Sequence, residues 1–373
     1  MSDHKLIVVK IGTNSLTNES GTIAPAKLRN LVKQVIKLKD DGHLVIIVTS
    51  GAIAAGYTQL GYHKRPTSIA AKQASAAVGQ GLLMEEYNRI FTSHGIVTAQ
   101  LLLTRDDFKD KRRYKNAWSA LEVLLNRNTV PIINENDTVS IAELKFGDND
   151  KLSAQVAAMV HADLLILATD INGLYTADPR NDPSASLIPL VEHITPEIEG
   201  LAQGSKTQNS TGGMFTKISA AKLATKAGVP VFICNASNDN ILLKVVNNTA
   251  VGTYFPALKS MNTRKQWMAF YAPTNGSIFI DQGASEALCK YGKSLLPVGV
   301  KAIDGTFSSG DIVEVYLFDN KEKIGTGMIN YSSDELRSVL GLSTLEINSI
   351  QVNNKKSEVI HHNDWVTSIN KEE

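Results

Sequence analysis

The residues best suited to chemistry lie in one short segment, residues 146–154, which reads FGDNDKLSA. It places the carboxyl groups of Asp148 and Asp150 on either side of Asn149, and apolar residues at helical spacing follow. Asp150 is therefore a candidate N-cap for a helix. A cap needs only one polar residue, however, and here three stand in a row. Two carboxylates and an amide suit a ligand that carries both an ammonium group and oxygen atoms.

Two further places favour an anion. Lys10 ends the apolar run 6–9, where a lysine is disfavoured unless it meets a negative charge, and Gly12 beside it permits close backbone approach. A lysine next to exposed N–H groups suits a phosphate. Ser50 and Gly51, at the start of a small-residue helix, offer the same geometry to a carboxylate or phosphate.

A second glycine cluster precedes a predicted helix. It consists of Thr211, Gly212, Gly213, Met214, Phe215, Thr216 and Lys217. The cluster lacks the Walker A pattern, but two glycines and a lysine at a helix start can still bind phosphate. Lys10 and Lys217 would then flank a transferring phosphoryl group, with Asp150 between them, because phosphoryl transfer needs mainly positioning and charge stabilisation. The alternative is a flexible loop with a solvated lysine.

The elements that must position these residues alternate in type. Apolar runs at 6–9, 44–48, 97–102, 130–133, 164–167 and 229–233 are separated by helical patterns such as 26–41. Continuous Val, Ile and Leu runs indicate strands covered on both faces, and alternation with helices indicates parallel pairing. The sequence therefore predicts an α/β fold, a three-layer αβα sandwich with a mostly parallel central sheet.

In such a sheet, ligands bind beyond the carboxyl ends of the strands. Polar, glycine-rich segments follow four of the runs, at 10–15, 49–56, 134–138 and 168–175. Any one alone is typical of an ordinary turn, but four together predict a shared site. They bring Asn134, Asp137, Thr169 and Asp170 to the same edge as Lys10. Asp170 suits nucleotide recognition, with a turn or helix cap as the alternative.

The 373 residues are long enough for two domains. After about residue 256, short β-like runs follow one another closely, which predicts a small separate β-rich domain. We expect a catalytic domain at 1–256, a packed linker at 257–275, the β-rich domain at 276–354 and a C-terminal tail at 355–373.

Bulk composition narrows the class of protein. A net charge of +1 gives no global field that would attract nucleic acid or a membrane. Cys234 and Cys289 are too few for a disulfide framework, so we expect both to be small core residues of a cytoplasmic protein. No signal peptide and no transmembrane run of about 20 apolar residues is expected.

The motifs, taken in order, resemble those of the amino acid kinase superfamily. They are KIGT at 10–13, TSGA at 49–52, NEND at 134–137, FGDNDKLS at 146–153, TDxxGLY at 169–175 and GGMxxK at 212–217. The combined NEND and FGDND segments resemble the branch that phosphorylates free glutamate. Residues 276 to about 354 resemble a PUA domain, through GSI at 276–278, SLLPxGV at 294–300 and GxFxxGD at 305–311.

The resemblance implies that ATP and L-glutamate, with Mg²⁺, give L-glutamyl 5-phosphate and ADP, the first step of proline biosynthesis. It implies that Lys10 and Lys217 stabilise the transferring phosphoryl group and that Asp150 orients them. Ser50, Gly51, Asp137 and Asn149 would bind glutamate, with Asn134 and Asp148 near its ammonium. ATP would be held by Lys10, Gly12, Thr169, Asp170 and the loop from Thr211 to Lys217. No protein metal ligand is assigned, because Mg²⁺ is held mainly by phosphate oxygens and water.

The resemblance further implies feedback inhibition by proline, a homo-oligomer (a dimer or tetramer) and a functional coupling to glutamyl phosphate reductase. Two rival readings stay open. One is a kinase for another small acid, such as N-acetylglutamate or aspartate, although Asp137 and Asp148 favour a free ammonium. The other is an RNA-binding protein, argued from the PUA-like domain, with Lys290, Lys293 and Lys301 as a candidate basic patch.

Overall fold

The computed structural model describes residues 4–18, 22–139, 148–203, 213–258, 263–342, 346 and 358–367. The chain divides into two compact units. The first comprises residues 1–107 and 112–260, and the second comprises residues 108–111 and 261–373. Among the described residues, none of the helices combines the length and the apolar character needed to cross a membrane.

A seven-stranded sheet forms the centre of the first unit, in the order β3-β4-β2-β1-β5-β6-β7. Its strands are β1 (Leu6–Ile11), β2 (Leu44–Val48), β3 (Thr98–Leu103), β4 (Val130–Glu135), β5 (Leu164–Thr169), β6 (Val231–Asn235) and β7 (Thr253–Phe255). Every pairing is parallel except that of β6 with β7. The six apolar runs therefore form the six parallel strands, as predicted, and β7 is a short edge strand that the sequence did not indicate.

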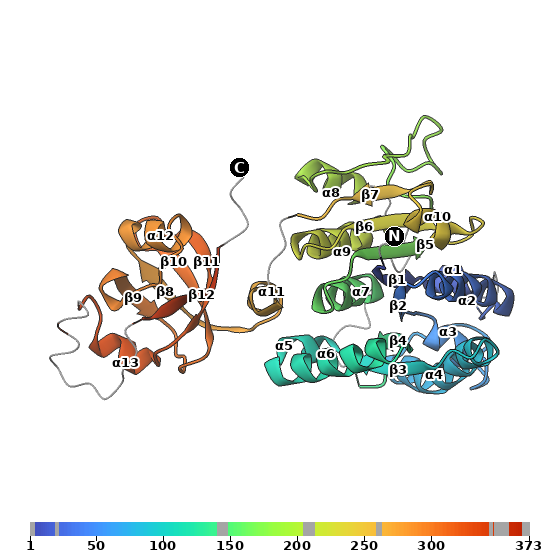
Figure 1. Cartoon of the computed structure of the whole chain (residues 1–373), viewed down its shortest axis with the longest axis horizontal. Helices are drawn as coiled ribbons and strands as arrows, with labels where there is room; N and C mark the ends of the chain where they lie inside the picture. The colour runs from blue at the N-terminus through green and yellow to red at the C-terminus, as the bar shows by residue number, and fades with distance from the viewer. Residues whose placement is uncertain are drawn as a thin grey trace. The chain divides into compact units, whose positions relative to one another are not determined.

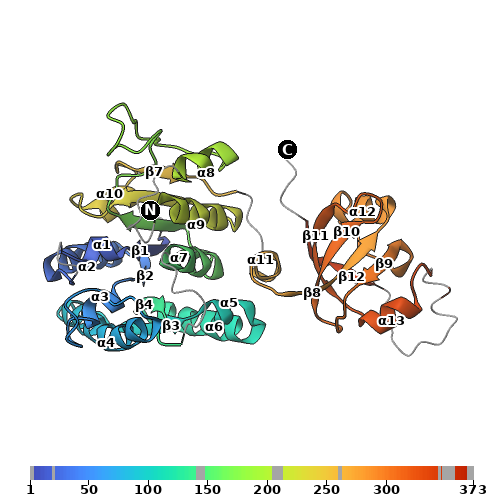
Figure 2. The ribbon, with the colours of Figure 1, turned by 180° about the vertical axis from the view of Figure 1, so that it is seen from behind.

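Helices cover both faces of this sheet and complete the predicted three layers (Figure 1). One layer holds α1 (Thr13–Leu16), α2 (Pro25–Asp40), α3 (Ala52–Gly56), α4 (Ile69–Thr92) and α10 (Ile241–Val246). The other holds α5 (Arg105–Lys109), α6 (Lys111–Asn126), α7 (Asp148–Met159), α8 (Pro196–Gln203) and α9 (Met214–Lys226). The view from behind shows the same two layers (Figure 2).

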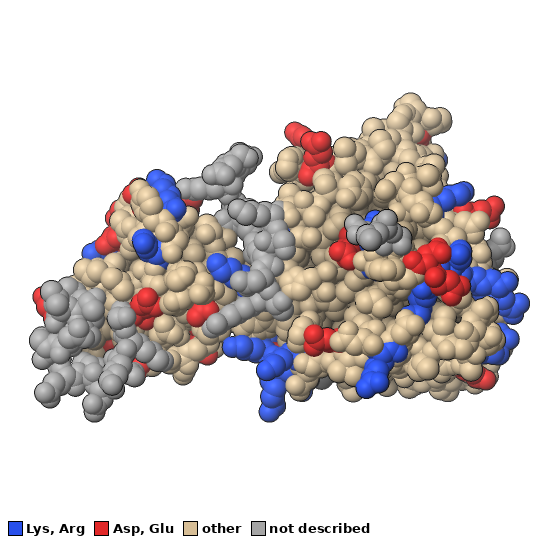
Figure 3. Space-filling model, viewed as in Figure 1, with Lys and Arg blue, Asp and Glu red and all other residues tan. Residues whose placement is uncertain are grey.

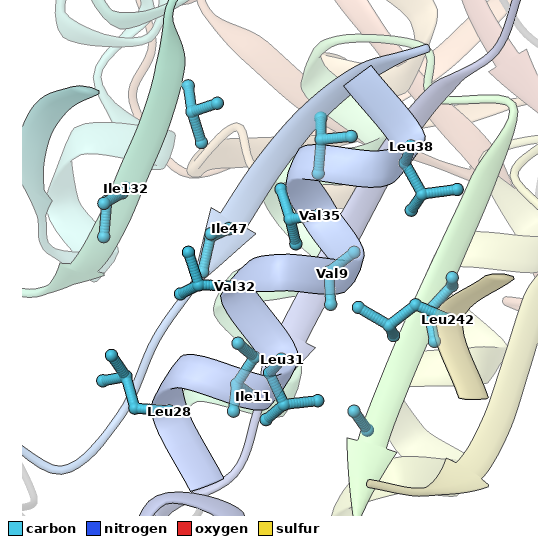
Figure 4. Packing of buried hydrophobic residues seen from close by; sticks show 14 of the residues in the cluster. Val9, Ile11, Leu28, Leu31, Val32, Val35, Leu38, Ile47, Ile132 and Leu242 are labelled. Carbon is cyan, nitrogen blue, oxygen red and sulfur yellow. The ribbon is translucent and has the colours of Figure 1, made fainter. Parts of the chain in front are cut away.

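The core between α2 and the sheet follows directly from sequence periodicity. The buried residues Leu28, Leu31, Val32, Val35 and Leu38 recur at helical spacing and form one apolar stripe. Figure 4 shows this stripe turned toward side chains of β1 and β2, in a single buried cluster. Proline at the first position of α2 suits a helix start, because its missing N–H would have no partner there. The packing fixes β1 and β2, whose ends carry two of the polar segments.

The second unit contains a five-stranded sheet in the order β12-β11-β10-β8-β9. Its strands are β8 (Thr274–Ile280), β9 (Val300–Asp304), β10 (Ile312–Leu317), β11 (Lys323–Ile329) and β12 (Ile360–Thr367). Its helices are α11 (Thr263–Phe270), α12 (Gln282–Cys289) and α13 (Ser333–Ser338). The small β-rich domain is thus present, with its own apolar core.

Two details of this unit differ from expectation. Strand β12 pairs with β11 but lies within residues 355–373, which the sequence predicted as a tail. Cys289, expected in the core, is exposed, because it ends α12 on the solvent side, whereas Cys234 is buried as expected. The predicted linker contains α11, where Trp267 is buried, so this part is packed. Basic and acidic side chains alternate over the face of this unit seen in Figure 3.

Candidate active site

The four polar segments meet at one edge of the first sheet. Strands β4, β2, β1 and β5 are direct neighbours and run parallel, so their carboxyl ends lie side by side. These ends carry Asn134, the Thr49–Ser50 pair, Lys10 and the Thr169–Asp170 pair, respectively. The start of α7 lies against the same edge, because side chains at its N-terminal end bond to residues of β1, β2 and β4.

Asp150 is the third residue of α7 and links the two predicted lysines. Its Oδ1 lies 2.6 Å from Nζ of Lys10, and its Oδ2 lies 3.3 Å from Nζ of Lys217. The hydroxyl of Thr216 donates to Oδ2 at 2.7 Å. The expectation that Asp150 caps the helix was wrong, because the helix begins at Asp148 and both Asp150 oxygens face these groups from other elements.

This ion cluster is buried, which gives it unusual electrostatics. The side chains of Lys10, Lys217 and Asp150 are 9%, 6% and 1% exposed. Burial alone would raise the pKa of Asp150, but the two lysines outweigh burial and bring its pKa down to about 2. For Lys10, burial is the larger effect and lowers the pKa, although Asp150 opposes it. Asp150 is therefore a fixed carboxylate that holds two ammonium groups in place.

Asn149, one residue earlier, faces a different part of the site. Its Nδ2 lies 2.8 Å from the backbone oxygen of Thr49, 2.9 Å from Oγ of Ser50 and 3.0 Å from Oδ1 of Asn134, so its two protons are shared among three acceptors. Successive side chains of a helix point about 100° apart. One turn of α7 thus serves two regions, an ammonium-rich region at β1 and α9 and an amide and hydroxyl region at β2 and β4.

Asp137 follows β4 and is partly buried. Burial raises the pKa of its carboxyl group to about 6, although the nearby Arg65 acts in the opposite direction. A carboxylate whose charge is poorly solvated gains from a positively charged ligand. Asp137 is thus chemically suited to an ammonium group.

The end of β5 forms a third group. Thr169 Oγ1 donates to Oδ1 of Asp170 at 2.9 Å, and Asn14 Nδ2 donates to Oδ2 at the same distance. Burial would raise the pKa of Asp170, but these hydrogen bonds outweigh it and lower the pKa. The carboxylate therefore joins α1 to the end of β5 from an exposed position.

The glycines of the predicted phosphate loops leave space. A Cβ placed on Gly12 would lie 3.5 Å from Nζ of Lys10, in van der Waals contact, so glycine keeps a side chain away from this amino group. Gly51 has φ +99°, a left-handed conformation that favours glycine, and α3 starts directly after it. Gly213 precedes α9, whose first residues are Met214 and Phe215, and within the described part of the chain no atom lies within 4 Å of its Cβ position. Thr211, Gly212 and the side chain of Asp148 lie outside the described residues.

Two residues of α4 contact the site and are not among those predicted from the sequence. On α4, the side chain of Gln80 accepts a hydrogen bond from Nδ2 of Asn134 at 2.8 Å, and Tyr87 Oη lies 2.9 Å from Oγ1 of Thr49. Both residues are buried and stand two turns apart on one face. The available signal was a lone glutamine within a run of small and apolar residues at 74–83. Thr216, which is predicted to contact ATP, also donates its hydroxyl to Asp150.

Comparison with known proteins gives two family matches. Residues 5–235 match the amino acid kinase family, and residues 276–350 match the PUA domain. Glutamate 5-kinase of Streptococcus suis is 50% identical over 364 residues, which cover 97% of this chain and 99% of that protein. Glutamate 5-kinase of Streptococcus pneumoniae serotype 4 is 50% identical over 365 residues, covering 98% and 96%.

Among solved structures, carbamate kinase from Giardia lamblia bound to AMP-PNP is similar with a TM-score of 0.49 and 15% identity. The match covers 69% of this chain and 100% of that one. UMP kinase from Bacillus anthracis is similar with a TM-score of 0.48 and 15% identity, covering 69% of this chain and 98% of the other.

Proposed function

The chain belongs to the amino acid kinase family, and we propose that its strand-end site carries out the glutamate 5-kinase reaction with the residue roles that follow. The reaction transfers the γ-phosphoryl group of ATP to the side-chain carboxylate of L-glutamate and yields L-glutamyl 5-phosphate and ADP. The observation that carries the proposal is the division of α7, where Asp150 holds two lysines and Asn149 holds a separate polar region.

The phosphoryl group is stabilised by Lys10 and Lys217. The carboxylate of glutamate has a pKa of about 4.3, so at neutral pH it is an ionised nucleophile and no general base is needed. Its oxygen forms the new P–O bond while the bond to the ADP oxygen breaks, and no proton moves. Charge accumulates on the equatorial oxygens during transfer, and two ammonium groups fixed by Asp150 meet that charge without reorganising.

The amino acid is bound by Ser50, Asn149 and Asp137. Ser50 Oγ already accepts from Asn149, so the serine proton is available to a carboxylate. Asp137, as a carboxylate, offers a partner for the ammonium group, and we assign the same role to Asp148. The α3 start at Gly51 brings backbone N–H groups to the same region. Asn134 is 2% exposed and bonded at both ends of its amide, which supports a role in holding Asn149.

ATP is bound by the β5 end and the start of α9, through Thr169, Asp170 and the loop from Thr211 to Lys217. The donors present fit Mg²⁺ carried by the nucleotide. Within the described ranges, no group of three or more His, Cys, Asp or Glu side chains could hold a metal ion, and Asp150 is occupied by lysines. The metal, when bound, neutralises phosphate charge, and most of its ligands are phosphate oxygens and water.

We further propose that proline inhibits the enzyme at a site shared with glutamate, since a pocket for the shared α-amino acid group suits both. A homo-oligomer, a cytoplasmic location and a functional coupling to glutamyl phosphate reductase complete the proposal.

For the second unit we propose a PUA domain from about residue 274 to residue 367, which includes β12. The mixture of acidic and basic side chains on its visible face gives no support to RNA binding as the main activity (Figure 3).

The decisive experiment measures ADP release from ATP with glutamate, N-acetylglutamate, aspartate and UMP in parallel, each with and without proline. Of the four acceptors, we expect only glutamate to give ADP release, and we expect proline to suppress this release. Equal release with N-acetylglutamate would contradict the proposed ammonium site. Insensitivity to proline would remove the inhibition from the proposal and leave the kinase reaction standing.

A further inference from the structure

The two ends of the Gln80 amide have different surroundings. Gln80 is 8% exposed, and its Oε1 accepts from Nδ2 of Asn134 at 2.8 Å. Its Nε2 is buried and has no hydrogen-bond partner among the described residues. A buried donor without a partner destabilises the folded protein. A glutamine at this position therefore calls for an explanation, and the explanation lies with its oxygen.

The Gln80 oxygen ends a chain of hydrogen bonds, called the relay below, that runs from Ser50 through Asn149 and Asn134 to Gln80. Which atom donates and which accepts is fixed at both ends of this relay. The backbone N–H of Glu135 can only donate, and it donates to Oδ1 of Asn134 at 2.9 Å. This contact turns the Asn134 Nδ2 toward Gln80, which supplies the required acceptor. A glutamate could also accept, but it would bury a negative charge.

The far end of the relay is fixed in the same direction. The backbone oxygen of Thr49 can only accept, so the Asn149 amide nitrogen points inward, toward Thr49 and Asn134. Its amide oxygen is then turned the other way, as an acceptor. Ser50 Oγ is an acceptor for Asn149, which leaves the serine proton as a donor. An acceptor beside a donor matches the ammonium and carboxylate groups of an amino acid.

Helix α4 anchors this relay to the scaffold. Tyr87, two turns after Gln80, contacts the side chain of Thr49. Gly79, the residue directly before Gln80, lies against α3. A Cβ on Gly79 would lie only 1.8 Å from the backbone oxygen of Ala52, so the two helices touch through their backbones. The carboxyl ends of β2 and β4 are thus both held from α4.

We propose that Gln80 is a positioning residue for the amino-acid half of the site. Its amide oxygen holds Asn134, and through Asn134 it keeps Asn149 and Ser50 in the orientation that suits a free amino acid. The inference rests on the proposed assignment of Asn149 and Ser50 to glutamate. It adds a residue of α4, 54 positions before Asn134, that acts through Asn134.

The test compares Gln80→Leu and Gln80→Glu in the full-length enzyme, with glutamate and ATP varied separately. Loss of one hydrogen bond of about 1 kcal/mol predicts a rise in the glutamate KM of roughly threefold to tenfold for Gln80→Leu. The ATP KM is expected to stay within about twofold, since the relay ends at the amino-acid side. Gln80→Glu keeps an acceptor, and burial favours the neutral, protonated form of the new side chain, so this variant should bring the glutamate KM most of the way back to the native value.

Gln34→Leu is the matched control. Gln34 on α2 is also buried, and its Oε1 also accepts one hydrogen bond, from the backbone N–H of Leu242 at 2.9 Å. Its Nε2, like that of Gln80, has no hydrogen-bond partner within the described part of the chain. Gln34 belongs to no part of the relay. We expect Gln34→Leu to lower the thermal midpoint as much as Gln80→Leu does, with an unchanged glutamate KM. An equal rise in glutamate KM for both variants would reduce Gln80 to a structural residue and overturn the proposal.

A double-mutant cycle separates failure of the relay from failure of the site. In an Asn149→Ala background, Gln80→Leu should add little to the glutamate KM, because its effect passes through Asn149. Full additivity would refute the relay. If Asn149→Ala raises the glutamate KM while Gln80→Leu does not, the relay is wrong and the site stands. If Asn149→Ala itself leaves the KM unchanged, the proposed amino-acid site is wrong.

Discussion

Lys10 Nζ lies 2.6 Å from Asp150 Oδ1, and both side chains are withdrawn from water, with 9% and 1% exposed. With Lys217, the cluster holds two positive groups and one negative group, a net charge of +1 when all three are ionised. Burying such a group is costly, so its presence is better explained by a negatively charged ligand than by stability. A phosphoryl group in transfer is such a ligand.

Asp150→Asn should destabilise the folded protein and nearly abolish turnover. Removing the one carboxylate leaves two buried ammonium groups facing each other, at a cost of about 3–5 kcal/mol in unfolding free energy. Asp41→Asn is the control, because Asp41 pairs with Lys37 on the surface, where ion pairs contribute little. Urea denaturation measures both. Equal stability of the Asp150→Asn variant and the native protein would mean that the lysines do not depend on Asp150.

Lys217→Ala should act on turnover. Its ammonium group would stabilise charge that appears during transfer, so we expect kcat to fall by about 10²–10³, with the glutamate KM changed far less. Lys226→Ala, at the other end of α9, is the control and should leave kcat unchanged. A variant with normal kcat and only a raised glutamate KM would contradict the role given to Lys217.

The pH dependence of kcat/KM for glutamate should follow the ionisation of the Asp137 carboxyl group. Its pKa is raised to about 6, so the carboxylate form that binds ammonium prevails above that pH and is lost as the pH falls through it. At saturating ATP, kcat/KM for glutamate should therefore decline below about pH 6, since this ratio reports the free enzyme. In Asp137→Asn, the ratio should be low throughout and should lack this inflection. An unchanged inflection would assign it to another group.

The sequence predicted the parallel sheet well, because a strand buried on both faces needs an unbroken apolar run and every such run became a strand. It also brought Lys10, Asp150 and Lys217 into one hypothesis, and their side chains do meet. It failed where contacts depend on packing between elements. Nothing in the local pattern around Gln80 tells which strand end α4 will face, and the pairing of β12 with β11 spans a long stretch of chain.

The N-cap assignment of Asp150 failed for a related reason. An acidic residue before an apolar helical pattern satisfies the local rule for a cap. The local rule contains no information on two lysines that arrive from β1 and α9, and their charges determine where this carboxylate points. Asp150 thus departs from the local expectation at the position where a ligand charge is expected to act.

Gly79 allows the close packing of α4 against α3, which supports the site but takes no part in the reaction. The α3 and α4 backbones meet at Gly79 and Gly56, and a Cβ on Gly79 would clash with backbone atoms that have no room to yield. Gly79→Ala should therefore destabilise the protein by more than about 1 kcal/mol. Since α3 begins directly after Gly51, the shift should also raise the glutamate KM. The control is Gly81→Ala on the same helix, where, beyond the backbone of α4 itself, no atom of the described residues lies within 4 Å of the new Cβ. Alanine favours a helix over glycine by about 1 kcal/mol, so this variant should be slightly more stable than the native protein. Thermal denaturation and glutamate kinetics on both variants decide the matter, and similar stability of the two would rule out the close contact between α3 and α4.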